Sequence, residues 1–295
     1  MSSKALYWKD GVKIELHEGT GSSIARGITV SGDSVYIAGS LSTNIGYWKD
    51  GVRTDIILPY GEAVSFPCSI FIIDNSIYFI ANYIYNDKSI AFYWKDGVKT
   101  DLIVDTYHTS ANAAFVYEDS VYILGQYHDN QGISKPCYWK DGIKTDLPTE
   151  QDHTSTNAGV ISNGSIYITG TDQYDNGISF VQDSCYWING VKTNLTSVYS
   201  SSSAILVYNS SIYITGEYFV DDILYACYWK DGVRTILPTP TGTEHSATSA
   251  IVESEGSIYI TGYYINNNNF YACYWKDGVR TDLVSGIITM DILIK

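Results

Sequence analysis

The chain has 295 residues, of which 45% are hydrophobic and 17% charged, and its formal net charge is −14. This composition can bury a large core and is unlike that of a disordered chain. With 18 Lys and Arg against 32 Asp and Glu, the chain lacks the surplus of cations that binds nucleic acid or an anionic membrane surface, so we expect neither as a partner.

The first predicted element is a hairpin at the start of the chain, with the sequence Tyr7-Trp8-Lys9-Asp10-Gly11-Val12. An Asp-Gly pair between two strand-like runs favours a tight turn, because both central residues of such a turn need positive φ. The fifth copy of this motif departs from the pattern and reads Trp187-Ile188-Asn189-Gly190. All Trp residues of the chain belong to the motif: Trp8, Trp48, Trp94, Trp139, Trp187, Trp229 and Trp275.

A second strand motif alternates with the first and reads Ser-Ile/Val-Tyr-Ile/Phe. A tight turn such as Asn163-Gly164 precedes it, so each repeat of roughly 45 residues is predicted to form a four-stranded antiparallel meander. Both faces of the strand at 257–261 carry large apolar groups, which fits stacked sheets better than a two-layer sandwich. The Tyr residues of the motif are Tyr36, Tyr78, Tyr122, Tyr167, Tyr213 and Tyr259.

These patterns predict an all-β fold, a single β-propeller domain over residues 1–295, with seven blades favoured and six as the alternative. The segment at 291–294 resembles a short copy of the second motif. Its pairing with the N-terminal hairpin would close the ring and remove exposed sheet edges. The predicted blades cover approximately 20–57, 60–103, 108–148, 155–196, 200–238 and 245–284, with a closing blade made of 1–16 and 285–295.

The motifs at 34–39 and 47–52, Ser-Val-Tyr-Ile-Ala-Gly and Tyr-Trp-Lys-Asp-Gly-Val, resemble the repeats of a group of bacterial proteins with Tyr-Trp-Lys-Asn-Gly repeats. More distantly, the layout is similar to kelch and WD-repeat propellers, although the kelch Gly-Gly doublet and the Trp-Asp dipeptide are absent. The resemblance covers almost the whole chain. It implies a propeller architecture and no catalytic residue.

Repeated Cys and Trp residues are interpreted as core residues. Cys137, Cys185, Cys227 and Cys273 each stand immediately before a Tyr-Trp pair, and equivalent positions in different blades are too far apart for a disulfide. We therefore expect small buried hydrophobic groups, with a reactive thiol as the alternative. The seven Trp are expected to pack between blades, and the alternative is an exposed stacking platform for sugars.

Candidate binding residues lie on the connections between the second and third strands. The segments 82–89, 126–135, 171–184 and 263–269 differ widely, and we interpret them as variable loops on a constant scaffold, where recognition usually occurs. They are rich in acidic residues, of which Asp172 and Asp175 are candidates. Either this face binds a basic partner or a cation, or these are ordinary solvated loops.

His108, His153 and His245 stand 14 residues before the Tyr of their repeat. We expect them near the mouth of a central channel, as metal ligands or acid–base groups, or as inherited caps of an incoming strand. Arg26, Asn112, Asn157 and Ser249 share another repeat position and are expected to form a polar rim there.

The leading functional prediction is a non-enzymatic binding or scaffolding propeller that engages a protein partner through its loops. A lectin-like propeller that binds glycans is the alternative, and an enzyme with a site at the channel mouth is the second alternative. No cofactor or metal is expected. The sequence has no apolar run long enough for a transmembrane helix and starts without a signal core, so we expect a cytoplasmic protein, or an extracellular one if the chain was trimmed.

Overall fold

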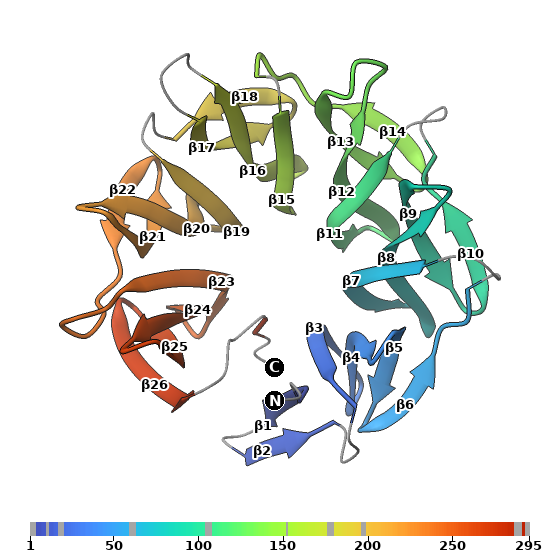
Figure 1. Cartoon of the computed structure of the whole chain (residues 1–295), viewed down its shortest axis with the longest axis horizontal. Helices are drawn as coiled ribbons and strands as arrows, with labels where there is room; N and C mark the ends of the chain where they lie inside the picture. The colour runs from blue at the N-terminus through green and yellow to red at the C-terminus, as the bar shows by residue number, and fades with distance from the viewer. Residues whose placement is uncertain are drawn as a thin grey trace. The chain divides into compact units, whose positions relative to one another are not determined.

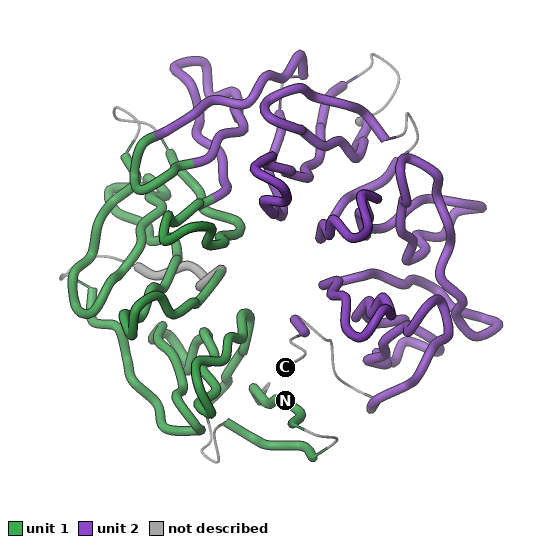
Figure 2. The backbone as a smooth tube through the Cα atoms, turned by 180° about the vertical axis from the view of Figure 1, so that it is seen from behind, with its two compact units in different colours: residues 1–123, 139–143 green, residues 124–138, 144–295 purple. Residues whose placement is uncertain are grey.

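The computed structural model describes residues 4–9, 12–16, 21–58, 63–103, 108–151, 153–175, 180–195, 199–285 and 291–292. The chain divides into two compact units: residues 1–123 with 139–143, and residues 124–138 with 144–295 (Figure 2). Throughout the described residues the regular elements are β-strands. No helix in them could cross a membrane.

The first unit begins with a hairpin of β1 (Leu6–Lys9) and β2 (Val12–Glu15). Two four-stranded sheets follow. The first contains β3 (Ser23–Ser31), β4 (Ser34–Leu41), β5 (Asn44–Lys49) and β6 (Val52–Asp55). The second contains β7 (Ala63–Ile73), β8 (Ser76–Tyr85), β9 (Lys88–Lys95) and β10 (Val98–Asp101). The first unit also contains β11 (Thr109–Tyr117), and the boundary between the units runs through the next three strands: β12 (Ser120–His128), β13 (Ser134–Lys140) and β14 (Ile143–Asp146).

The second unit continues with three more sets of four strands (Figure 1). The first set is β15 (His153–Ser162), β16 (Ser165–Asp175), β17 (Phe180–Ile188) and β18 (Val191–Asn194). The second is β19 (Ser200–Tyr208), β20 (Ser211–Val220), β21 (Ile223–Lys230) and β22 (Val233–Ile236). The third is β23 (His245–Ser254), β24 (Ser257–Asn266), β25 (Asn269–Lys276) and β26 (Val279–Ser285). One parallel bridge, Ser134 to His153, joins β13 to β15.

Strands pair with their neighbours in chain order, which confirms the predicted all-β fold and its four-stranded antiparallel sheets. The seven-blade count, the single domain and the closing blade stay predictions. Of the closing segment 285–295, residues 286–290 and 293–295 lie outside the described part of the chain.

The repeated Lys-Asp-Gly turn is fixed by its Asp side chain. Asp50 has a φ of 49° and Gly51 one of 82°, as the predicted tight turn requires. The Asp50 carboxylate also accepts a hydrogen bond of 2.9 Å from the Val35 N–H, where the second strand of the sheet begins. Asn189 in the fifth copy uses its amide oxygen in the same way, at 3.0 Å from the Ile166 nitrogen. The departure in this copy therefore preserves the turn.

The connections between second and third strands are mostly tight turns, so the prediction of long variable loops is wrong for several repeats. The segment 263–269 contains a turn at Asn267 and Asn268, whose φ angles are 50° and 58°. The segment 171–184 is largely strand, because β16 extends to Asp175 and β17 starts at Phe180. Asn and Asp tolerate positive φ, so polar pairs that read as loop form the turns of long hairpins.

The repeated Trp residues form the core of the sheets. Trp48, Trp139, Trp187, Trp229 and Trp275 are at most 1% exposed, so at these five positions the Trp are packed as predicted and the alternative, an exposed sugar platform, is absent. A small residue must face the Trp. A Cβ added at Gly170 would lie 2.2 Å from the Ser155 carbonyl oxygen and 2.7 Å from Cζ3 of Trp187. This close approach explains the single Gly that ends the second motif.

In four of the first strands, a hydroxyl at the start of the strand connects it to the preceding sheet. Ser23 Oγ accepts from the Ala5 N–H at 2.9 Å, and Thr109 Oγ1 accepts from the Ala91 N–H at 2.9 Å. Ser200 and Ser246 do the same for Ser184 and Ala226. First strands are also neighbours within each unit: β7 contacts β3 and β11, and β19 contacts β15 and β23 (Figure 1).

Candidate functional site

The side chains at the repeat position of the aligned His residues contact the preceding sheet. His108 Nδ1 accepts a hydrogen bond of 3.1 Å from the backbone N–H of Ser89. His153 Nδ1 accepts one of 3.4 Å from the N–H of Ser134. Both imidazoles therefore accept from the third strand of the preceding sheet, whereas the strand-cap interpretation placed them as caps of the incoming first strand. Among the described residues, no group of His, Cys, Asp and Glu could hold a metal ion.

At the same repeat position, 14 residues before Tyr213, stands Tyr199. Its hydroxyl lies 3.4 Å from Gln182 Oε1 in β17 of the preceding sheet. Its ring meets Phe219 of β20 edge to face, with 6.1 Å between centroids, and its carbonyl accepts from the Phe219 N–H at 3.0 Å. Tyr199 was not predicted as a site residue, because the pattern at this position was defined by the His of three other repeats.

Two amide side chains complete what we call the Tyr199 cluster, made of Gln173, Gln182, Tyr199 and Phe219. Gln173 and Gln182 are directly opposite each other on β16 and β17, and Gln173 Nε2 donates to Gln182 Oε1 at 3.2 Å. Tyr199 and Phe219 are each 38% exposed. The cluster thus presents aromatic surface beside amide groups to solvent, at the hairpin ends of two adjacent sheets in the second unit.

His245 makes a second contact of this kind. Its Nε2 lies 2.8 Å from Glu217 Oε2, and its ring packs edge to face on Tyr263, 5.7 Å between centroids. Tyr263 in turn packs against Phe270. Burial, followed by the nearby Glu217 charge, raises the pKa of Tyr263 above its usual value. The three predicted His therefore serve three separate contacts with different partners.

The predicted polar rim coincides with β-bulges in the first strands. The pairing register shifts at Arg26 in β3, at Asn157 in β15 and at Ser249 in β23. A bulged residue lies outside the strand pairing, and its side chain is redirected. The redirected Asn157 side chain donates to Ser202 O in β19 at 2.7 Å and to Thr171 Oγ1 at 2.9 Å.

These bonds give Asn157 a role in joining β15 to β19. Asn112 of β11 accepts from the Ser110 hydroxyl at 3.3 Å. Arg26 and Asn112 belong to the first unit, Asn157 and Ser249 to the second.

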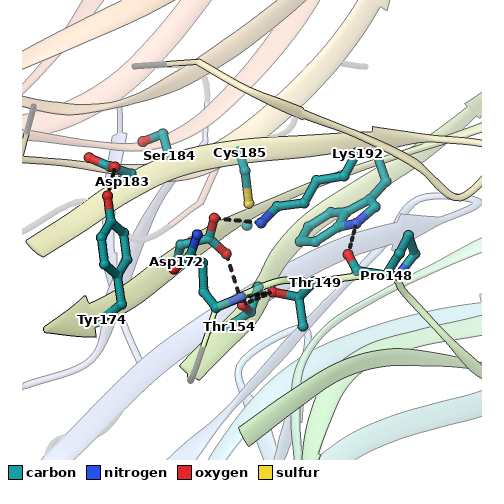
Figure 3. A network of polar contacts seen from close by, with 12 residues as sticks. Pro148, Thr149, Thr154, Asp172, Tyr174, Asp183, Ser184, Cys185 and Lys192 are labelled. Atoms are coloured by element: carbon teal, nitrogen blue, oxygen red, sulfur yellow. Dashed lines mark hydrogen bonds and ion pairs between the residues drawn. The ribbon is translucent and has the colours of Figure 1, made fainter. Parts of the chain in front are cut away.

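The candidate Asp172 is buried, contrary to its predicted place on a solvated loop, whereas Asp175 is exposed at the end of β16. Figure 3 shows Asp172 between Lys192 and Thr154. One carboxylate oxygen lies 2.5 Å from Lys192 Nζ, and the other accepts from Thr154 Oγ1 at 2.8 Å. Thr154 also contacts Thr149 at 2.6 Å. The long strand β16 carries Asp172 into the sheet, which the loop interpretation did not foresee.

The network around Asp172 replaces an arrangement found in other repeats. There, the position of Asp172 is a Tyr whose ring lies beside the Lys or Arg of the fourth strand, for example Lys99 at 3.7 Å from the Tyr83 centroid. That cation also pairs with an Asp two residues later, as Lys99 does with Asp101 at 3.2 Å. In β18 this Asp is Asn194, so Lys192 pairs with Asp172 instead. The other Tyr at this position are Tyr127, Tyr218 and Tyr264.

Pro136 explains why Thr154 is available to Asp172. At Thr109, Ser200 and Ser246 the equivalent hydroxyl accepts from a backbone N–H in the third strand of the preceding sheet. Here that third-strand residue is Pro136, which has no N–H. The Thr154 hydroxyl instead donates to the carboxylate of Asp172, its cross-strand partner.

Asp183 completes this buried network. It lies opposite Asp172 in the strand pairing, and one of its oxygens accepts from the Tyr174 hydroxyl at 2.8 Å (Figure 3). The other oxygen, Oδ1, is buried without a hydrogen-bond partner in the described part of the chain. Burial raises the pKa of Asp183, and the neighbouring charge of Asp172 contributes to the rise. Both carboxylates of this network are therefore buried, Asp172 at 1% and Asp183 at 5% exposure.

No family model and no curated protein matches the sequence. Similar solved structures include AofleA from Arthrobotrys oligospora, 10% identical with a TM-score of 0.51, where the match covers 91% of this chain and 88% of that one. A polysaccharide lyase, PL25 ulvan lyase bound to a GlcA–Rha3S saccharide, is 10% identical with a TM-score of 0.58, covering 89% and 83%. Drosophila Semaphorin 1a is 8% identical with a TM-score of 0.50, covering 92% and 81%.

The chain is an all-β propeller. At these identities the matches show the fold alone. They give no support to the kelch-like or bacterial resemblance, which stays a prediction.

Proposed function

We propose that this propeller binds carbohydrate, and that its sugar site is the Tyr199 cluster. The observation that carries the proposal is the exposed Tyr199–Phe219 pair beside the amides of Gln173 and Gln182. Aromatic rings offer apolar surface to the C–H face of a sugar, and amides both donate and accept hydrogen bonds with its hydroxyls. A few polar groups placed beside apolar surface are typical of small-molecule sites.

Two observations favour carbohydrate over the scaffolding function that we placed first. That prediction relied on long variable loops, and several of these connections are tight turns. In addition, a propeller of similar fold has been solved with a bound saccharide, so the architecture is compatible with such ligands. The proposal uses no catalytic group, because His108 and His153 are engaged as caps of neighbouring strands.

The test is binding of the full chain to an array of neutral oligosaccharides, followed by calorimetric titration with those that bind. We expect Tyr199→Ala and Phe219→Ala to weaken binding at least about tenfold, since each removes a wall of the site. Tyr85→Ala is the matched control, because Tyr85 is an exposed Tyr at the end of a second strand outside the cluster. Binding to no glycan, or equal losses in the control, would contradict the proposal.

A further inference from the structure

We infer that β22 is a docking edge for an extended, acidic protein segment, which joins the sheet of β19 to β22 as a fifth strand and places a carboxylate on Arg234. The inference goes beyond the proposed carbohydrate function and uses no residue of the Tyr199 cluster. β22 is the last strand of its sheet, and among the described strands it pairs with β21 alone (Figure 1). All four of its residues are exposed.

The outer side of β22 presents backbone groups that an added strand can bond. In an antiparallel pair, residues alternate between those bonded to the partner strand and those whose N–H and C=O point away from it. Leu237, which follows β22, donates its N–H to the Ala226 carbonyl at 2.8 Å and so is bonded to the partner strand. By the same alternation, the backbone groups of Arg234 and Ile236 point outward. The side chains of these two residues lie on one face of the sheet, because they are two residues apart.

The end of β22 lacks the polar residue found in the equivalent strands. In β6, β10, β14 and β26 the residue two after the Lys or Arg is an Asp, and in β18 it is Asn194. In β22 this residue is Ile236, which is 41% exposed, and Val233 at the start of the strand is 71% exposed. Charged side chains on an edge strand oppose the addition of another strand, whereas exposed apolar ones favour it. The charge that remains on this face of β22 is that of Arg234, which favours an acidic partner.

The Arg234 guanidinium lacks the carboxylate that its counterparts have. Arg53 and Arg280 each donate their Nε–H to the Asp two residues later, at 2.8 Å. Arg234 lies over the Tyr218 ring, with 3.4 Å from its Cζ to the ring centroid, and forms no ion pair with any described residue. Stacking on a ring fixes the plane of a guanidinium and leaves its N–H groups to bond a carboxylate in that plane. Arg234 is therefore preorganised for a carboxylate from outside the chain.

These features favour a polypeptide over another carrier of a carboxylate. An added strand bonds the outward N–H and C=O groups of the edge, and its side chains pair with those directly opposite. A carboxylate opposite Arg234 completes the ion pair, and a β-branched side chain near Ile236 covers its apolar surface. A uronic sugar offers the carboxylate but not the regular backbone bonds.

The probe is a pair of display libraries of peptides of about eight residues, in which β-branched residues alternate with variable ones. The central residue is fixed as Asp in one library and as Asn in the other. We expect the full wild-type chain to enrich the Asp library, and the best Asp peptide to bind at least about tenfold more tightly than its Asn twin, because the bond to Arg234 is charge-assisted. Ile236→Asp should weaken that peptide at least about tenfold, since it gives Arg234 the internal carboxylate that Arg280 already has.

Thr235→Asp is the matched control, because it puts the same charge on the same strand but on the opposite face of the sheet. We expect it to weaken the peptide by no more than about twofold, through screened repulsion alone. Equal enrichment of the two libraries by wild type would overturn the inference, and so would equal losses in Ile236→Asp and Thr235→Asp. Displacement of the peptide by a similar concentration of free glucuronic acid would also overturn it and indicate a site for acidic sugars. Glycan binding at the Tyr199 cluster should be unchanged in Ile236→Asp, so the proposed function is tested separately.

Discussion

Individual side chains show where one repeat departs from the others. In the sheet of β15 to β18, Asp172 replaces a Tyr, Asn194 replaces an Asp, and Pro136 removes a backbone donor from the preceding sheet. Each change alone would leave a buried polar group without a partner. Together they give Lys192 and Thr154 a common partner in Asp172. The sequence contained these substitutions, but their connection depends on which strands face each other.

Replacing Asp183 by Asn should stabilise the protein at neutral pH. The folded state raises the pKa of Asp183, so its contribution to stability is fully present below the pKa of the unfolded chain and is lost as pH rises through the folded pKa. Asn stays neutral and still accepts from Tyr174. Thermal unfolding between pH 4 and 8 should show a higher midpoint for Asp183→Asn than for wild type near pH 7. The difference between the two midpoints should decrease toward pH 4.

Asp172→Asn is the matched comparison, because Asp172 lies directly opposite Asp183 in the strand pairing. It leaves the Lys192 ammonium without its partner, and breaking a buried ion pair in this way costs about 3 kcal/mol. The two carboxylates should therefore respond in opposite directions at pH 7. A shift of both midpoints in the same direction would contradict this account of the network.

Hairpins are the elements that the sequence predicts best. The Asp-Gly signal places the third and fourth strands correctly, because positive φ at both central residues leaves few alternatives. The hairpins formed by the second and third strands are harder to predict from the sequence, since Asn267-Asn268 and similar pairs are equally common in loops. The Tyr199 cluster was missed for a related reason. The cluster brings together residues from three strands of two sheets, and no local sequence pattern predicts that these residues are in contact.

The turn Asp should tolerate Asn and resist Ala. Asp231 has a φ of 50° and accepts from the Ile212 N–H at 2.8 Å. Asn can do both, as Asn189 shows. Ala would lose the acceptor and occupy a left-handed conformation, at a cost of about 1–3 kcal/mol. In urea unfolding, the free energy of unfolding of Asp231→Asn should be close to that of wild type, and that of Asp231→Ala should be clearly lower. An equal loss of unfolding free energy in both variants would show that the charge of Asp231 is the stabilising feature instead.

For the chain as a whole, the repeat predicts an all-β propeller because the same two motifs recur along almost its entire length. The number of blades is less accessible, since it depends on how the two ends of the chain meet. No repeat motif specifies that contact. Burial of five of the repeated Trp follows from the pattern alone, because the second motif is apolar on both faces.

The buried Cys provide a measure of global opening. Cys137, Cys185, Cys227 and Cys273 are free and buried, and burial raises the pKa of the Cys273 thiol to about 12. A thiol-reactive dye should therefore leave these four unmodified in native buffer and label them only as denaturant unfolds the sheets. Labelling of one of these Cys well before the loss of circular dichroism would show that its sheet opens independently.

The hydroxyl at the start of a first strand, where it bonds to the preceding sheet, also has a consequence for biosynthesis. The Ala91 N–H finds its acceptor in Thr109, and the Ala226 N–H in Ser246, which are 18 and 20 residues further along the chain. In a nascent chain leaving the ribosome, such a third strand thus has one N–H without its acceptor until the following first strand emerges. Maturation of the propeller lags translation by about half a repeat, and each newly made segment secures the one before it.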